Sequence, residues 1–140
     1  MKIEVLENGF MPEKAHEDDA GYDIRSAEEL TLNPGQSLLV KAGFKMMLPK
    51  NMEAQVRSRS GWANKHQIIV LNSPGTIDPG YRGEVGVILA NLGAKAMKIE
   101  RGDRIAQMVF AKFESPEITE GKVTEKSNRG EGGFGSTGEK

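Results

Sequence analysis

The chain has 140 residues, a hydrophobic content of 37% and a formal net charge of -1. This length is close to the commonest domain size, so we expect one domain with a packed core. The near-neutral charge argues against binding a nucleic acid polymer. The sequence has no cysteine, and its two histidines form no paired-ligand motif, so disulfides, thiolate metal sites and a tightly held zinc are not expected.

Short alternating runs of apolar residues predict strands at residues 2–6, 52–57 and 84–89. Turn signals rich in Gly, Pro and Asn separate such runs at short intervals, a spacing typical of a sandwich or barrel. One short helix is predicted to begin near Ser60 and to run through residue 65. The sequence therefore predicts an all-β fold.

No apolar stretch approaches the roughly 20 residues that span a bilayer, and the amino end resembles a strand rather than a targeting segment. We expect an untargeted, soluble, cytoplasmic protein that has no membrane partner.

The carboxyl end differs from the rest, because residues 127–140 read SNRGEGGFGSTGEK and offer little apolar surface. We predict a β-barrel domain at residues 1–126 and a mobile arm at residues 127–140. A frayed terminus is the plain alternative. However, a glycine-rich backbone can approach phosphates closely, and Phe134 could close over a flat ring, so the arm has the ingredients of a nucleotide lid.

Two familiar motifs in this arm fail on their context. The pattern GxGxxG occurs twice, but a dinucleotide fold needs a helix after it, and too few residues follow. A phosphate-binding P-loop is also excluded, because Glu139 stands where its lysine belongs.

Two segments in the middle of the chain carry groups suited to phosphate chemistry. Arg59, Ser60 and Gly61 place a guanidinium, a hydroxyl and an open amide at the predicted helix start, although an ordinary serine cap would look the same. The second segment, GTIDPGY at residues 75–81, has the composition of a hairpin turn in which Asp78 could form an Asx-type bond.

Five ordered segments together resemble the five motifs of the homotrimeric dUTPase family. They are DDAGYDIRSA at 18–27, RSRSGWANKH at 57–66, NSPGTIDPGYRGEVGVI at 72–88, ERGDRIAQMVF at 100–110 and RGEGGFGSTG at 129–138. The resemblance implies a distorted jelly-roll-like β-barrel that hydrolyses dUTP to dUMP and pyrophosphate. Such an enzyme limits uracil incorporation into DNA and supplies dUMP for thymidylate synthesis.

The resemblance also implies a role for each matching residue. Asp78 would deprotonate the water that attacks the α-phosphorus, and Tyr81 would pack under the deoxyribose and reject a 2′-hydroxyl. The hairpin backbone near Gly86 would read the uracil edge, and the lack of side-chain bulk there would help to exclude the methyl of thymine. The residues that would line this pocket are Asn72, Thr76 and Ile77.

The remaining roles concern the phosphates and closure of the site. By resemblance, the phosphates would be held by Arg59, Ser60, Gly61 and Gln107. Two residues, Asp23 and Arg104, would brace the site. The arm of another subunit in a homotrimer would close it with Arg129, Phe134, Ser136 and Thr137. Mg²⁺ would arrive on the triphosphate, so no protein metal ligand is assigned.

The sequence departs from the family pattern in two places. Ser58 stands where proline is usual, and Trp62 stands where an aliphatic residue is usual. Two roles stay open for Trp62, namely local packing of the phosphate loop and a contact between subunits. His66 has no partner nucleophile in the sequence and is interpreted as structural.

Two rival functions remain. A dCTP deaminase shares the fold and part of the third motif, but its catalytic glutamate is replaced here by Ile88, and such enzymes lack the arm. A trimeric binding module without turnover is the second rival, and the presence of Asp78, Tyr81, Arg129 and Phe134 together argues against it.

Overall fold

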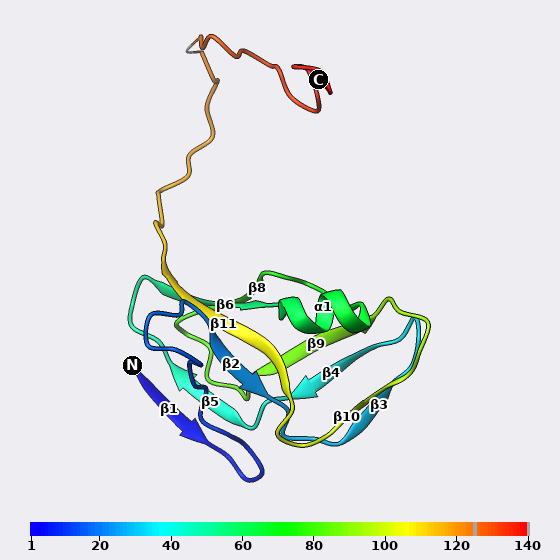
Figure 1. The fold of residues 1–140 in the computed structure, drawn as a ribbon. Coiled ribbons are helices and arrows are strands. Elements are labelled where there is room, and N and C mark those ends of the chain that lie inside the picture. Colours follow the sequence, from blue (N-terminus) through cyan, green and yellow to red (C-terminus); the bar gives the residue numbers. More distant parts are fainter. Residues whose placement is uncertain (125, 140) are drawn as a thin grey trace.

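The computed structural model describes residues 1–124 and 126–139. Within these residues the chain forms eleven strands and one helix (Figure 1). Their bounds are β1 (Lys2–Val5), β2 (Tyr22–Arg25), β3 (Leu30–Leu32), β4 (Ser37–Lys41), β5 (Phe44–Met47), β6 (Met52–Arg57), α1 (Ser60–His66), β7 (Ile68–Val70), β8 (Gly75–Ile77), β9 (Gly86–Asn91), β10 (Met97–Ile99) and β11 (Arg104–Lys112). The prediction of an all-β, jelly-roll-like fold is confirmed.

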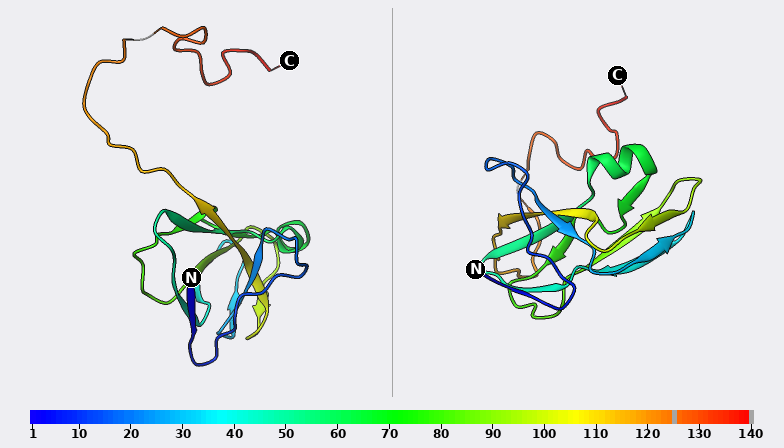
Figure 2. Two further views of the ribbon diagram at one scale, coloured as in Figure 1. Left: turned by 90° about the vertical axis from the view of Figure 1, so that its left-hand side faces the viewer. Right: turned by 60° about the horizontal axis from the view of Figure 1, so that its bottom comes forward.

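The strands pair antiparallel throughout the described residues. One sheet has the order β2-β11-β6-β8, a second has the order β4-β9-β7, and two further pairs, β1-β5 and β10-β3, complete the barrel. Figure 2 shows from two sides how these short sheets wrap around one interior, with β11 crossing the body of the molecule. Because β8 lies in the first sheet and β9 in the second, the segment between them passes from one sheet to the other.

The interior is filled from alternating strand positions. Ala54 and Val56 of β6 are buried, as the alternation at residues 52–57 predicts. Val85, Val87 and Leu89 are also buried on one face, although β9 begins at Gly86 rather than at Glu84. The strand starts later because the backbone of Val85 pairs elsewhere: its N–H donates to the Phe44 carbonyl at 2.8 Å, and its carbonyl accepts from the Ala42 N–H at 2.9 Å.

The helix begins at the predicted residue, Ser60, and ends at His66. Gln67 follows with a positive φ of 54°, and its N–H donates to the Ala63 carbonyl at 3.1 Å, which closes the last turn. Trp62 packs against the hydrophobic core, so local packing accounts for it in the isolated chain. His66 lies exposed in the last turn, where a basic residue suits the helix dipole.

After β11 the chain leaves the barrel, and Figure 1 shows the carboxyl end standing apart from it. Residues 113–124 and 126–139 contain no helix or strand, and Phe134 is fully exposed. The predicted domain boundary at residue 127 and the mobility of the arm stay predictions. Glu125, in the predicted barrel domain, and Lys140, in the predicted arm, lie outside the described residues. No helix in the described part of the chain is long and apolar enough to cross a membrane.

Candidate functional site

A first cavity, which we call the hairpin pocket, opens between β4, β9 and the segment that joins β8 to β9. Its volume is about 330 Å³. It is lined by six residues that the sequence predicted, namely Asn72, Thr76, Ile77, Asp78, Tyr81 and Gly86. It is also lined by five that it did not, namely Leu39, Lys41, Glu84, Val85 and Ile88. The structure therefore brings together, in one cavity, the residues predicted to contact uracil, the residue predicted to contact the deoxyribose, and the predicted catalytic residue.

The turn after β8 fixes the position of Tyr81. The Tyr81 N–H donates to the Asp78 carbonyl at 3.1 Å, and the Tyr81 hydroxyl donates to the Glu84 carbonyl at 2.9 Å. A Cβ on Gly83 would overlap the hydroxyl end of the Tyr81 ring, so the ring could keep this position only beside a glycine. Among the described residues the Asp78 carboxylate accepts no hydrogen bond, so the Asx-type bond is not formed and the carboxylate is exposed.

Two further glycines shape the same pocket by leaving space for neighbouring side chains. A Cβ on Gly75 would lie 3.1 Å from the Asn72 side-chain nitrogen, which therefore packs directly on the backbone of β8. A Cβ on Gly86 would lie 2.7 Å from Leu39 Cδ1. A Cβ at Gly86 would displace the end of the Leu39 side chain, and one at Gly75 would crowd the Asn72 amide.

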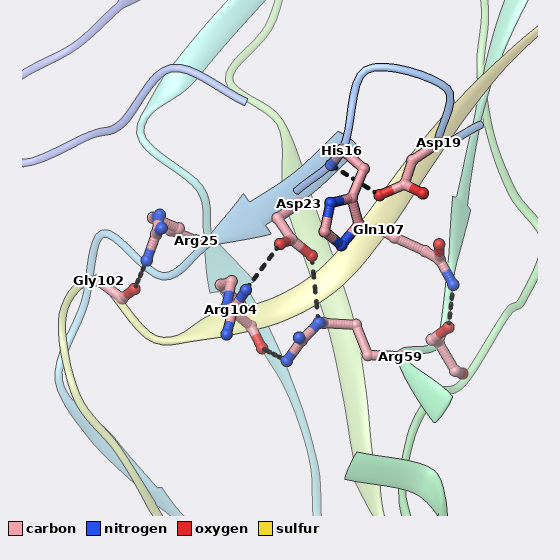
Figure 3. Close-up of polar contacts among 9 residues, drawn as sticks. His16, Asp19, Asp23, Arg25, Arg59, Gly102, Arg104 and Gln107 are labelled. Atoms are coloured by element: carbon pink, nitrogen blue, oxygen red, sulfur yellow. Dashed lines mark hydrogen bonds and ion pairs between the residues drawn. The ribbon is translucent and has the colours of Figure 1, made fainter. Parts of the chain in front are cut away.

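A second region, which we call the phosphate pocket, is organised by the Asp23 carboxylate (Figure 3). Arg59 Nε lies 3.2 Å from Asp23 Oδ1, and Arg104 Nη1 lies 3.3 Å from Asp23 Oδ2. Arg59 Nη1 also donates to the Arg104 carbonyl at 3.0 Å. The carboxylate is only 18% exposed, so screening by solvent is reduced and the three groups hold one another in place.

Two adjoining cavities form the phosphate pocket. The first, about 190 Å³, is lined by Ala15, Asp23, Arg59, Ser60, Gly61, Arg104 and Gln107. The second, about 330 Å³, is lined by Ala15, Asp19, Ala20, Gly21, Asp23 and Gln107. Gln107 Nε2 donates to the Ser58 carbonyl at 3.0 Å, which fixes the side chain shared by both cavities. All six predicted residues of motifs one, two and four thus meet here: Asp23, Arg59, Ser60, Gly61, Arg104 and Gln107.

The serine-cap alternative is wrong. The N-cap position of α1 is Arg59, with extended backbone angles, and Ser60 is the first helical residue. Within the described residues no side chain caps the helix. Ser60 and Gly61, in the first turn, line the phosphate pocket, and no side-chain cap occupies the amides of this turn in the described residues.

The four predicted arm residues lie together but apart from both pockets. Arg129, Phe134, Ser136 and Thr137 line a hollow of about 540 Å³ formed by the arm alone. Arg129 Nε donates to the Gly132 carbonyl at 2.7 Å, which bends the arm locally. The hairpin pocket and the phosphate pocket share no lining residue. In one chain the predicted site is therefore divided into three separate parts.

Sequence reasoning missed the β4 wall of the hairpin pocket, Leu39 and Lys41. Leu39 occupies an outward position of β4, because its neighbour Val40 is fully buried. The sequence offered no signal for Leu39, because Leu38, Leu39 and Val40 are consecutive apolar residues and only the folded strand shows which of them points outward. The phosphate pocket also has lining residues outside the predicted set, namely Ala15, Asp19, Ala20 and Gly21.

The dUTPase family model matches residues 7–138. Deoxyuridine 5'-triphosphate nucleotidohydrolases of Clostridium tetani and Gloeothece citriformis are each 50% identical over 139 residues, which is 99% of this chain and 96% of theirs. A mutant dUTPase of Staphylococcus bacteriophage 80alpha, solved with dUpNHpp, has a TM-score of 0.91 at 31% identity, with 98% of this chain and 97% of that chain covered. A mutant dUTPase of phage phi11 of S. aureus, described as coordinating a structural Mg(II) ion, has a TM-score of 0.80 at 28% identity, with coverage of 86% and 95%.

The family match and the fold agree on one class of protein, a nucleotide hydrolase with a jelly-roll-like barrel. The chain belongs to the dUTPase family. It hydrolyses dUTP, as the relatives named for this activity do, and yields dUMP and pyrophosphate.

Proposed function

We propose that hydrolysis proceeds by attack of water on the α-phosphorus of dUTP, with Asp78 as the general base. The observation that carries this proposal is the exposed Asp78 carboxylate at a pocket whose Tyr81 ring is fixed by the same turn. Phosphoryl transfer asks a protein mainly for positioning and for charge around the oxygens, so one carboxylate base is sufficient. The 80alpha dUTPase solved with dUpNHpp supports a nucleotide in this fold.

The hairpin pocket would hold the nucleoside. Tyr81, anchored through its hydroxyl to the Glu84 carbonyl, would pack under the deoxyribose and leave no room for a 2′-hydroxyl. The backbone near Gly86 would read the polar edge of uracil, and the remaining contacts would come from Asn72, Thr76 and Ile77.

The phosphate pocket would hold the triphosphate. Arg59, the Ser60 hydroxyl, the Gly61 amide and Gln107 offer positive charge and donors to phosphate oxygens. Asp23 and the Arg104 carbonyl keep the Arg59 guanidinium in a fixed orientation. A guanidinium oriented in advance loses less side-chain entropy when the anion binds.

Mg²⁺ fits this site as an ion that the triphosphate carries. Among the described residues no group of three or more His, Cys, Asp or Glu side chains could hold a metal ion. Of the two pocket carboxylates, Asp23 is engaged by two arginines, and Asp19 Oδ2 accepts a hydrogen bond from the His16 N–H at 2.9 Å. When bound to the triphosphate, the ion would neutralise charge on its oxygens.

The active form would be a homotrimer in which each site takes its parts from different subunits. This proposal is supported by the division of the site, because two pockets share no residue and the arm stands apart from both. The arm would then close the site of another subunit with Arg129, Phe134, Ser136 and Thr137. We place the protein in the cytoplasm, where it would act on the free nucleotide pool, and cell fractionation tests this location.

The reaction is tested by pyrophosphate release with Mg²⁺ from dUTP, dTTP, dCTP and UTP in parallel, with the organic products identified. Turnover of dUTP to dUMP, with little activity on the other three, is expected. Formation of dUTP from dCTP would mean a deaminase. Nucleotide binding without any product would mean a binding module, and either result would overturn the proposal.

The shared site is tested by mixing two inactive chains. One carries Asp78→Asn and a complete arm, and the other retains Asp78 but ends at residue 128. Hybrid trimers should recover dUTP hydrolysis, because a truncated chain supplies the base and its neighbour supplies the arm. The matched control mixes the Asp78→Asn chain with a truncated chain that also carries Asp78→Asn, and should stay inactive. Hybrids seen by native mass spectrometry but lacking activity would contradict an arm acting between subunits.

A further inference from the structure

Leu39 is an apolar side chain in an unusual place. It lies on β4 between Leu38 and the fully buried Val40, so it points away from the core and is 64% exposed. In the antiparallel pair with β9 its partner is Ile88. Both residues line the hairpin pocket, so the outer face of this strand pair gives the pocket an apolar wall.

The contact between Leu39 and Gly86 shows how this wall is set. Gly86 is paired with Lys41, one side-chain position along the same face from Leu39. A Cβ added to Gly86 would lie 2.7 Å from Leu39 Cδ1 and 3.3 Å from Leu39 Cγ. The leucine side chain therefore packs directly on the backbone of Gly86, and the lack of a Cβ at Gly86 allows this close contact.

We propose that Leu39 is a specificity-determining residue, whose side chain limits the space beside the base and excludes pyrimidines that carry a substituent at C5. The inference rests on the proposed placement of uracil against the backbone near Gly86. If the polar O2, N3 and O4 edge faces that backbone, C5, which is bonded to C4, lies at the O4 end of this edge, next to the side chain that packs on Gly86. A leucine held on Gly86 then meets an added methyl group sterically, beyond what the main chain alone provides.

The primary test compares dUTP with dTTP in the full-length chain carrying Leu39→Ala. Adding or removing one methyl group in an apolar pocket changes discrimination by roughly tenfold to 200-fold. We expect the ratio of kcat/KM for dUTP over dTTP to fall by about tenfold or more. For dUTP itself, KM should rise several-fold while kcat stays nearly constant, because a contact made equally in the ground and transition states is lost.

A matched control is Leu92→Ala, because Leu92 is 66% exposed and does not line the hairpin pocket. This variant should keep the parent dUTP-to-dTTP ratio. A graded series of 5-fluoro, 5-bromo and 5-methyl deoxyuridine triphosphates should show that the gain of Leu39→Ala grows with the size of the C5 group.

The Gly86 contact supplies a second, independent test. Gly86→Ala should push Leu39 into the pocket and weaken dUTP turnover, and Leu39→Ala added to it should recover part of that loss. Thermal unfolding of each variant separates a site effect from a folding effect. Recovery in the double variant supports the proposal, whereas additive losses would overturn the steric coupling.

The two proposals fail in different ways. A parent chain that does not turn over dUTP would defeat the proposed function itself. Normal dUTP turnover with an unchanged dUTP-to-dTTP ratio in Leu39→Ala would defeat only the role of Leu39. Equal losses on both substrates would also defeat it, because Leu39 would then bind the ring without selecting it.

Discussion

The two pockets of the barrel are built on opposite plans. The shape of the hairpin pocket depends on three glycines, because each leaves space for a neighbouring side chain. Gly75 leaves space for Asn72, Gly83 for the Tyr81 ring and Gly86 for Leu39. The phosphate pocket depends on charged side chains that hold one another, with Asp23 placed between Arg59 and Arg104. A pocket that accepts a flat neutral base needs shape, whereas one that accepts a triphosphate needs oriented charge.

This difference predicts how each pocket responds to substitution. In the hairpin pocket an added methyl group moves a neighbour through direct contact, so shape and selectivity change together. In the phosphate pocket the loss of one charge leaves the backbone in place and releases the partners of that charge. The two kinds of damage can therefore be distinguished by substrate choice on one side and by affinity and salt dependence on the other.

The largest expected effect comes from Asp78→Asn in the hairpin pocket. Loss of the general base should lower kcat by about 10² to 10⁴. The affinity for dUpNHpp should stay nearly unchanged, because the walls of the pocket and the phosphate donors are intact. Single-turnover hydrolysis and isothermal titration measure the two quantities separately.

A control for Asp78→Asn is Glu114→Gln, which makes the same carboxylate-to-amide change at an exposed position that lines neither pocket. It should behave as the parent chain does. A parallel loss of dUpNHpp affinity in Asp78→Asn would contradict the assignment of Asp78 as base rather than binder.

A smaller effect is expected from Asp23→Asn in the phosphate pocket. The change keeps the size of the side chain but removes the charge that pairs with Arg59 and Arg104. Partly exposed ion pairs contribute up to about 1 kcal/mol each. A tenfold fall in kcat/KM for dUTP corresponds to roughly 1.4 kcal/mol and is the expected result.

The test of Asp23→Asn is steady-state kinetics at low and high ionic strength. Added salt should reduce the difference from the parent chain, because it screens the pairs that remain partly exposed. The opposite sign, a lower KM in the variant, would show that the Asp23 charge repels the phosphates more than its positioning of Arg59 helps them.

Much of this molecule could be predicted from its sequence, and the successes share a cause. The alternation at residues 52–57 and the helix start at Ser60 depend on local periodicity and local turn chemistry, and both were correct. The start of β9 was wrong, because long-range backbone bonds from Val85 to Ala42 and Phe44 decide it. Local patterns do not contain such partners.

The same limit applies to the site. The motif residues could be named because their order along the chain resembles a family, but Leu39 lies outside every motif and reaches the hairpin pocket only through the pairing of β4 with β9. The sequence does not show that Leu39 contacts the backbone of Gly86, and this contact is what suggests a function for it. Residues that contribute by register, rather than by motif, need the folded sheet to reveal them.

Ser58 also acts through a contact between strands, and its substitution gives the smallest expected effect on turnover. This serine stands where the family usually has proline, and its hydroxyl accepts the Val70 N–H at 2.9 Å, which ties the end of β6 to β7. Ser58→Ala leaves that half-buried amide without its acceptor, so the free energy of unfolding should fall by about 1 to 2 kcal/mol. Urea unfolding measures the change, with Ser37→Ala, an exposed serine on β4, as the control.

Because the Ser58 carbonyl still accepts from Gln107, kcat for dUTP should stay constant. A fall in kcat without a loss of stability would mean that the hydroxyl of Ser58 acts on the phosphate pocket, and not on the joining of the two sheets.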